Sequence, residues 1–193
     1  MTGDPKDDHF HVVAFSGSLG SSSSNTGLVR MAARLAPTRL RFEFVDWLRD
    51  LPYYDPDLEA DLPAVPTKWR STIRAADAVV IGMPEYNFGP PGLAKNAIDW
   101  LTRPTGNHAL SGKVVSMMTS GGKGGGTRVQ AGLGPIIGYL GNVVVDEPAI
   151  NIPFGAERIA VDGTTTDLEI EALVALRMEA VLAALVAQRS SVR

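Results

Sequence analysis

A loop rich in glycine and serine, residues 16–26, follows the first apolar segment and has the composition of a phosphate-binding turn. Gly17 and Gly20 allow the backbone to turn tightly, and the serines offer hydroxyl donors. Backbone N–H groups at the start of the following helix attract an anion, so a phosphate is the natural occupant. The alternative is a flexible loop in which Asn25 or Thr26 only caps the helix. The position directly after a strand favours the phosphate.

Other motifs fit this loop poorly. A Walker loop ends in Gly-Lys-Ser/Thr, and no lysine lies between Lys6 and Lys68. The dinucleotide fingerprint G-x-G-x-x-G is absent after the first strand. The G-x-S-x-G pattern of a nucleophile elbow is also absent from this loop. A phosphate therefore remains the natural occupant, and none of these three motifs accounts for the loop.

Two further loops have unusual composition. Residues 84–92 carry aromatic and amide side chains that could flank a planar ring and hydrogen-bond its edge. The alternative for this loop is a rigid proline turn with Tyr86 and Phe88 packed at an interface. Residues 120–126 are almost all glycine, which lets a ligand approach bare backbone, or else makes the loop simply flexible.

These loops come after strands of an alternating α/β pattern. The predicted strands are residues 10–15, 40–45, 78–83, 113–119 and 142–146, and the predicted helices are residues 25–36, 67–75, 93–101, 127–140 and a C-terminal helix that starts at a Thr166–Glu169 capping box. Such alternation predicts a parallel sheet with helices on both faces. Ligands bind such sheets outside the carboxyl ends of the strands, where we expect the three loops to meet.

The bulk composition suits one domain. The chain has 193 residues, so we predict a single domain over residues 1–193, with residues 1–9 as a disordered tail. A net charge of −3 without a long basic run argues against nucleic acid. The N-terminus does not resemble a signal peptide, and no apolar run is long enough for a membrane span. We therefore expect a cytoplasmic protein with no membrane partner.

Metal and thiol chemistry are not expected. The chain has no cysteine, so disulfides and thiolate sites are excluded, and electron transfer would need a bound cofactor. His9, His11 and His108 lack metal-ligand spacing. We predict no metal site.

The motifs resemble those of the NADPH-dependent FMN reductases and NAD(P)H:quinone reductases, a family of flavodoxin-like fold. The family pattern Gly-Ser-x-Arg-x-x-Ser-x-Asn corresponds to residues 17–25. Its second pattern is longer and corresponds to Pro84-Glu85-Tyr86-Asn87, Pro91-Gly92 and Lys95-Asn96-Ala97-Ile98-Asp99-Trp100. The glycine loop and residues 51–55 also fit, and the resemblance spans residues 12–145.

The resemblance implies a doubly wound five-stranded parallel sheet of order 2-1-3-4-5 that binds FMN. It implies NADPH or NADH as co-substrate and ping-pong hydride transfer to a quinone, free flavin or similar small acceptor, in a homodimer or homotetramer. It assigns no catalytic side chain, although Tyr86 is a candidate for an auxiliary role. The alternative is a non-catalytic flavin-binding electron carrier or sensor. The implied cofactor-binding residues are Ser16, Ser18, Ser23, Asn25, Thr26, Pro84, Glu85, Tyr86, Asn87, Phe88, Ser120, Gly121 and Gly122.

One departure from the family pattern concerns the phosphate. Gly20 stands where the family has an arginine, whose guanidinium would form charge-assisted bonds to phosphate. Its loss would cost on the order of 1–3 kcal/mol, or about one to two decades in affinity. Extra serine hydroxyls or Arg128 are candidates to compensate. Phe88-Gly89 also replaces the usual small pair after Asn87, and Pro90 adds stiffness, which would narrow the substrate pocket.

Overall fold

The computed structural model describes residues 8–191 of the chain. Residues 1–7, most of the predicted N-terminal tail, lie outside the described residues. Asp8, also assigned to that tail, forms an ion pair of 2.8 Å with Arg39.

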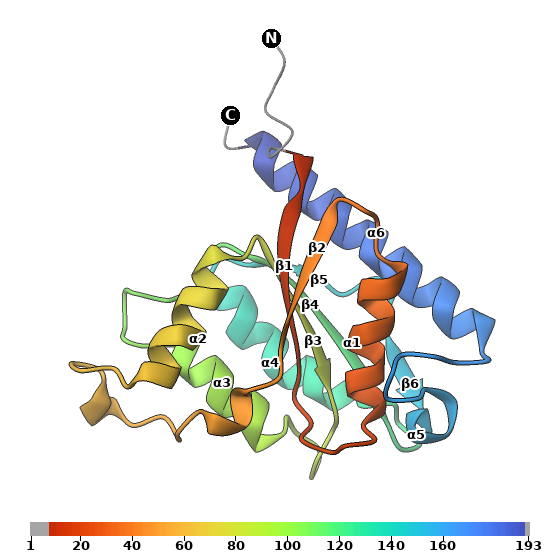
Figure 1. The fold of residues 1–193 in the computed structure, drawn as a ribbon, viewed down its shortest axis with the longest axis horizontal. Coiled ribbons are helices and arrows are strands. Elements are labelled where there is room, and N and C mark those ends of the chain that lie inside the picture. Colours follow the sequence, from red (N-terminus) through yellow and green to blue (C-terminus); the bar gives the residue numbers. More distant parts are fainter. Residues whose placement is uncertain (1–7, 192–193) are drawn as a thin grey trace.

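The core of the molecule is a parallel sheet of order β2-β1-β3-β4-β5, which confirms the predicted order (Figure 1). A short sixth strand, which the sequence did not predict, pairs with the far end of β4. The strands are β1 (Phe10–Ser16), β2 (Leu40–Val45), β3 (Ala78–Met83), β4 (Val114–Gly121), β5 (Val143–Val145) and β6 (Asn151–Pro153).

Helices cover both faces of the sheet, as predicted. Figure 1 shows α1 and α6 on one side and α2, α3 and α4 on the other, and each set packs on its own hydrophobic cluster. The α-helices are α1 (Ser24–Leu35), α2 (Ala64–Ala75), α3 (Gly92–Thr102), α4 (Thr127–Tyr139), α5 (Gly155–Arg158) and α6 (Leu168–Ser191), and the 3-10 turns are η2 (Leu48–Asp50) and η3 (Pro56–Leu58). The single-turn α5 was not predicted, and α2 begins earlier than expected. The glycines and Pro135 do not split α4.

Close contact between α1 and β3 places the phosphate loop on the sheet. Every residue of β3 is buried, as its apolar sequence predicts. A side chain at Gly82 would overlap the carbonyl oxygen of Asn25 and lie 2.7 Å from Val29 Cγ2. Gly82 therefore allows the first turn of α1 to lie directly against the strand.

The predicted capping box at the start of α6 is wrong. Asp167, one residue after Thr166, caps the helix, because its Oδ1 accepts from the backbone N–H groups of Glu169 (3.1 Å) and Ile170 (3.3 Å). Its Oδ2 accepts from Arg158 at 2.6 Å. The Arg158 hydrogen bond, with the helix N–H groups, lowers the pKa of Asp167 below its ordinary value. A carboxylate with an arginine partner and free N–H groups outcompetes the threonine hydroxyl.

The strand beside β4 is interrupted between β5 and β6, and Arg177 from α6 fills the interruption. Its fully buried guanidinium donates to the carbonyl oxygens of Val145 (2.7 Å) and Pro148 (2.6 Å) and to the Ser116 hydroxyl (3.0 Å). Burial lowers the pKa of Arg177 to about 10. Arg177 thus satisfies carbonyl groups that a continuous strand would have paired.

Candidate functional site

The loops after β1, β3 and β4 lie together at the carboxyl edge of the sheet, as the parallel topology requires (Figure 1). The backbone N–H of Gly17 continues the β1–β3 contact by donating to Gly82 O at 2.8 Å. A side chain at Gly17 would lie 3.0 Å from Pro91 and 3.1 Å from Ala94. The first two loops are therefore in direct contact.

The phosphate loop, residues 16–26, is shaped by its own serines. The Ser16 hydroxyl accepts from Ser18 N–H at 3.1 Å, and the Ser18 hydroxyl accepts from Gly20 N–H at 3.2 Å. The side chain of Ser23 caps α1 by accepting from Thr26 N–H at 3.4 Å. Ser23, rather than Asn25 or Thr26, is therefore the helix cap.

Several donors of this loop are not used within the protein. Within residues 8–191, the backbone N–H groups of Leu19, Ser21 and Ser22 make no hydrogen bond. Exposed N–H groups and hydroxyls at a helix N-terminus form an anion-binding arrangement. The donor chemistry of the loop thus fits a phosphate.

Asn25 joins the phosphate loop to the glycine loop after β4. Its amide donates to Ser120 O at 2.8 Å and accepts from Ser120 N–H at 2.9 Å. The hydroxyls of Ser24 and Ser120 are 2.8 Å apart. All three side chains are buried. Asn25 thereby fixes the relative position of the two loops, and its predicted contact with phosphate stays a prediction.

The second loop contains a tight two-residue hairpin. Tyr86 and Gly89 exchange backbone hydrogen bonds of 3.0 Å, and the central residues Asn87 (φ 51°) and Phe88 (φ 65°) are both left-handed. This backbone is that of a type I′ turn, which costs a bulky residue such as phenylalanine about 1–3 kcal/mol. Tyr86 is 56% exposed and Phe88 73% exposed, so the turn presents two aromatic rings to the surface.

An arginine fastens this hairpin to the start of α4. Glu85 accepts from the backbone N–H of Arg128 and from its guanidinium, both at 3.1 Å. The same guanidinium lies 4.6 Å from the centre of the Phe88 ring. Arg128, a candidate to replace the missing loop arginine, is therefore already engaged by the second loop.

The remaining predicted residues lie on the same edge. Pro84 is buried directly after β3, and Gly121 ends β4 beside Pro153 of β6. Gly122 is exposed, and its carbonyl accepts from Gly125 N–H at 3.0 Å. A side chain at Gly122 would meet no atom within 4 Å. The glycine loop thus leaves bare backbone accessible, as predicted.

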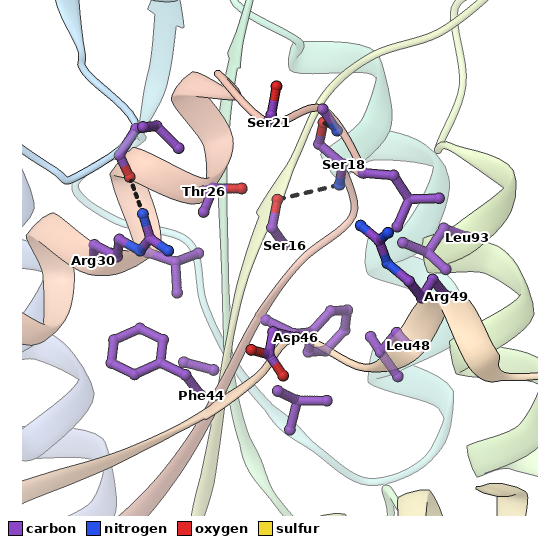
Figure 2. Close-up of a pocket in the computed structure, with 17 residues that line it drawn as sticks. Ser16, Ser18, Ser21, Thr26, Arg30, Phe44, Asp46, Leu48, Arg49 and Leu93 are labelled. Atoms are coloured by element: carbon purple, nitrogen blue, oxygen red, sulfur yellow. Dashed lines mark hydrogen bonds between the residues drawn. The ribbon is translucent and has the colours of Figure 1, made fainter.

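A cavity of about 430 Å³ lies under the phosphate loop and extends toward the end of β2 (Figure 2). It contains Ser16, Ser18 and Thr26, but none of the predicted residues from the second and third loops. Sequence reasoning missed the contribution of β2 and its neighbours. The polar and aromatic lining residues outside the implied cofactor-binding set are Phe15, Ser21, Arg30, Phe44, Asp46 and Arg49, of which Ser21 belongs to the predicted phosphate loop. The adjacency of β2 and β1 in the implied sheet order was the available signal.

The long second family pattern also has a structural role. Asn96 donates to Pro52 O at 2.9 Å and accepts from Tyr54 N–H at 2.8 Å, and the Trp100 indole donates to Pro52 O at 2.8 Å. Trp100 is buried, whereas Tyr53 is 87% exposed. The buried residues of α3 therefore hold the segment after β2 within the same subunit.

A small polar cluster lies beside that segment. The Tyr54 hydroxyl donates to Glu59, and Arg103 donates to Glu59 at 2.9 Å. The hydrogen bond to Glu59 raises the pKa of Tyr54, and the same bond lowers the pKa of Glu59. These residues do not line the cavity, so we assign them a structural role.

The parallel sheet of order β2-β1-β3-β4-β5 with helices on both faces is a flavodoxin-like fold, and the phosphate loop and the aromatic hairpin lie at the carboxyl edge where such sheets bind ligands. Residues 10–157 match the model of the NADPH-dependent FMN reductase family, and the chain belongs to that family. The match confirms the family recognised from the motifs. It also confirms FMN as cofactor and an NAD(P)H-dependent oxidoreductase as the class of enzyme.

Individual relatives agree with this assignment. The chain is 37% identical to a 2-hydroxy-1,4-benzoquinone reductase of Burkholderia sp over 76% of this chain and 80% of the relative. It is 31% identical to an NAD(P)H-dependent FMN reductase of Pseudomonas aeruginosa over 90% and 94%, respectively. The solved structure of FerB, a flavoenzyme NAD(P)H:(acceptor) oxidoreductase from Paracoccus denitrificans, superposes with a TM-score of 0.83 at 34% identity, covering 93% of this chain and 98% of FerB.

Two kinds of feature are absent from residues 8–191. No helix in that range is long and apolar enough to cross a membrane. No group of three or more histidine, aspartate or glutamate side chains in the same range is arranged to hold a metal ion.

Proposed function

We propose that the chain binds FMN with the phosphate in residues 16–26 and the flavin ring between residues 84–92 and 120–126. In this arrangement the protein transfers a hydride from NADPH or NADH to a quinone or a similar small acceptor. The bound flavin supplies the hydride chemistry, and the protein supplies position and electrostatics. The acceptor class is supported by relatives that are named quinone reductases.

The observation that carries this proposal is the fastening of the three loops to one another. Asn25 and Ser120 join the first loop to the third, and Glu85 and Arg128 join the second loop to the helix after the third. Loops held in this way present their donors in a fixed geometry, which lowers the entropy cost of binding a rigid ring. The unused N–H groups of the first loop then supply the phosphate contacts.

The aromatic hairpin is assigned to the substrate side of the ring. Tyr86 and Phe88 are exposed on a turn that is closed by its own hydrogen bonds. Their rings would shield one face of the site from water and provide a flat apolar surface for an acceptor. No side chain is assigned as a general acid or base, and Tyr86 keeps its proposed auxiliary role.

The finer features predicted from the sequence belong to this proposal. They are a ping-pong order of hydride transfer, a homodimer or homotetramer, and a cytoplasmic location. The exposed rings of Tyr53 and Tyr139 (both 87% exposed) are available for a subunit contact. The oligomer is tested by sedimentation of the purified protein.

The proposal is tested with the absorption spectrum of the purified protein loaded with FMN. We expect a flavin spectrum that bleaches on anaerobic addition of NADPH and returns on addition of a benzoquinone. Initial rates with both substrates varied should give parallel double-reciprocal lines, as in a ping-pong order. Bleaching that is absent with NADPH and NADH would instead support the non-catalytic flavin carrier. A colourless protein that takes up no FMN would refute both.

A further inference from the structure

We propose that Arg49 supplies to the FMN phosphate the positive charge that an arginine of the phosphate loop supplies in the family pattern. This inference rests on the proposed placement of FMN and adds a cofactor-binding residue from a different strand end. The family position itself is occupied by Gly20, which has no side chain to offer.

The fold brings Arg49 to the phosphate loop. β2 lies beside β1 in parallel register, with Phe15 opposite Val45, so the segment after β2 begins next to the loop after β1. Arg49 is in the 3-10 turn η2 of that segment and lines the same cavity as Ser16 and Ser18. In Figure 2 its guanidinium points toward Ser18.

The backbone that carries Arg49 is fixed. Leu48 is buried with 3% exposure, and the turn is closed by hydrogen bonds from Asp50 N–H to Trp47 O (3.0 Å) and from Leu51 N–H to Leu48 O (3.1 Å). The guanidinium of Arg49, in contrast, is exposed and makes no hydrogen bond or ion pair with any of residues 8–191. A fixed backbone together with an unpaired guanidinium suits a residue that binds an anionic ligand.

Neighbouring charges do not provide an equivalent group. Arg30 also lines the cavity, but its Nη1 donates to Val161 O at 2.8 Å. Arg128 is paired with Glu85 at 3.1 Å. Asp46 is the only carboxylate among the residues that line the cavity, and it forms no ion pair within residues 8–191. Arg49 is therefore the uncommitted cation of this cavity.

The space around Gly20 is consistent with Arg49 replacing an arginine at position 20. A Cβ atom at Gly20 would lie 3.4 Å from Ser18 Oγ and 4.0 Å from Ser23 Cβ, which are ordinary contacts. The backbone of Gly20 is not left-handed. An arginine therefore fits at position 20. Because glycine is there instead, the space is open to the Arg49 guanidinium, which comes from the η2 turn after β2. A charge-assisted hydrogen bond to phosphate requires a guanidinium at the right distance and angle, and the loop after β1 or the turn after β2 can supply it.

The experiment measures FMN and riboflavin affinities of the apoprotein by quenching of flavin fluorescence. Riboflavin lacks the phosphate but keeps the ring. We expect Arg49→Gln to lower the affinity for FMN about tenfold or more and to leave the affinity for riboflavin unchanged. When salt is added, the FMN affinity of the variant should fall less than that of the wild type, because one charge–phosphate contact is missing. The control removes an exposed arginine outside the cavity, Arg41→Gln at the distant end of β2, and should change FMN affinity less than threefold.

A rescue variant completes the test. Gly20→Arg in the Arg49→Gln background should restore most of the lost FMN affinity and again leave riboflavin unchanged. Unchanged FMN affinity in Arg49→Gln, or an equal loss for FMN and riboflavin, would overturn the inference while leaving the proposed function intact. A wild-type apoprotein that binds no FMN would overturn both.

Discussion

Two arginines whose guanidinium groups lie at strand ends differ in burial and in hydrogen bonding. In the gap between β5 and β6, Arg177 is fully buried and surrounded by acceptors, including Val145 O at 2.7 Å and Asp146 O at 2.5 Å. At the end of β2, Arg49 is exposed and makes no hydrogen bond within residues 8–191. Arginine thus fills the gap in the sheet at position 177 and keeps its hydrogen-bond donors unpaired at position 49.

Under the proposed role of Arg49, the difference separates an arginine that stabilises the fold from one that binds the ligand. Where a strand is interrupted, buried carbonyl groups need donors, and a long side chain with several N–H groups provides them. Where strands end at the ligand edge, unpaired donors remain accessible to a phosphate. Substitutions in the two regions should therefore differ, with loss of stability in one and loss of FMN affinity in the other.

The largest effect is expected for Arg177→Met. The change leaves the carbonyl oxygens of Val145, Asp146 and Pro148 without their donor, so the free energy of unfolding should fall by about 3–5 kcal/mol. Denaturant unfolding measures this loss. In the folded fraction, FMN affinity should stay near that of the wild type. A stability loss below about 1 kcal/mol would contradict the structural role.

The second effect is expected for Asn25→Leu, which removes both hydrogen bonds to the backbone of Ser120. Each buried backbone group left unpaired should cost about 1–3 kcal/mol, and FMN should bind more weakly because the two loops separate. Ser24→Ala is the matched control. It removes a single hydroxyl contact, for which we expect about 0.5–1.5 kcal/mol. Equal losses in the two variants would argue against Asn25 as the fastening residue.

The third effect concerns the approach of α1 to the sheet. Gly82→Ala places a methyl group against the carbonyl of Asn25 and should destabilise the fold by about 1–3 kcal/mol. Gly132→Ala in α4 is the control, since a Cβ there meets no atom within 4 Å. It should stabilise the helix by about 0.5–1 kcal/mol. Thermal and denaturant unfolding of both variants would settle the sign of each effect.

A smaller effect is expected from pH at the start of α6. Because the pKa of Asp167 is lowered in the folded state, its contribution to stability is present above the unfolded pKa and is lost as the pH falls through the folded one. The melting temperature of the wild type should therefore exceed that of Asp167→Asn by a few degrees at pH 7. The difference should begin to shrink only when the pH falls to about 4, the ordinary pKa of an aspartate, and should disappear below the lower folded pKa. A constant difference across this range would refute the ion pair with Arg158.

The smallest effect is expected for the stability of Arg49→Gln. An exposed side chain without a partner should change the free energy of unfolding by less than about 0.5 kcal/mol, in contrast to Arg177→Met. Arg177→Met should thus lower stability with little effect on FMN affinity, and Arg49→Gln should lower FMN affinity with little effect on stability. A large stability loss in Arg49→Gln would erase the distinction.

The sequence alone determined strands β1 to β5 and the long helices, and it predicted the edge of the sheet at which a ligand binds. Continuous apolar runs such as residues 78–83 predict buried parallel strands, because both faces of such strands are covered by helices. Glycine and serine after the first strand predict a phosphate loop from local conformational freedom and donor chemistry. The family motif at residues 84–87 then identified a flavin rather than another phosphate ligand. These signals are local, so they can be read along the chain.

Only the tertiary structure decided the features that depend on distant partners. The short strand at residues 151–153 exists because β4 extends past β5 and offers it a ladder. Asp167 became the cap of α6 because Arg158 lies beside it. Arg49 faces the phosphate loop because β2 lies next to β1. Composition near each of these residues is unremarkable, since the decisive contacts join segments that are separated in sequence and meet only in the folded chain.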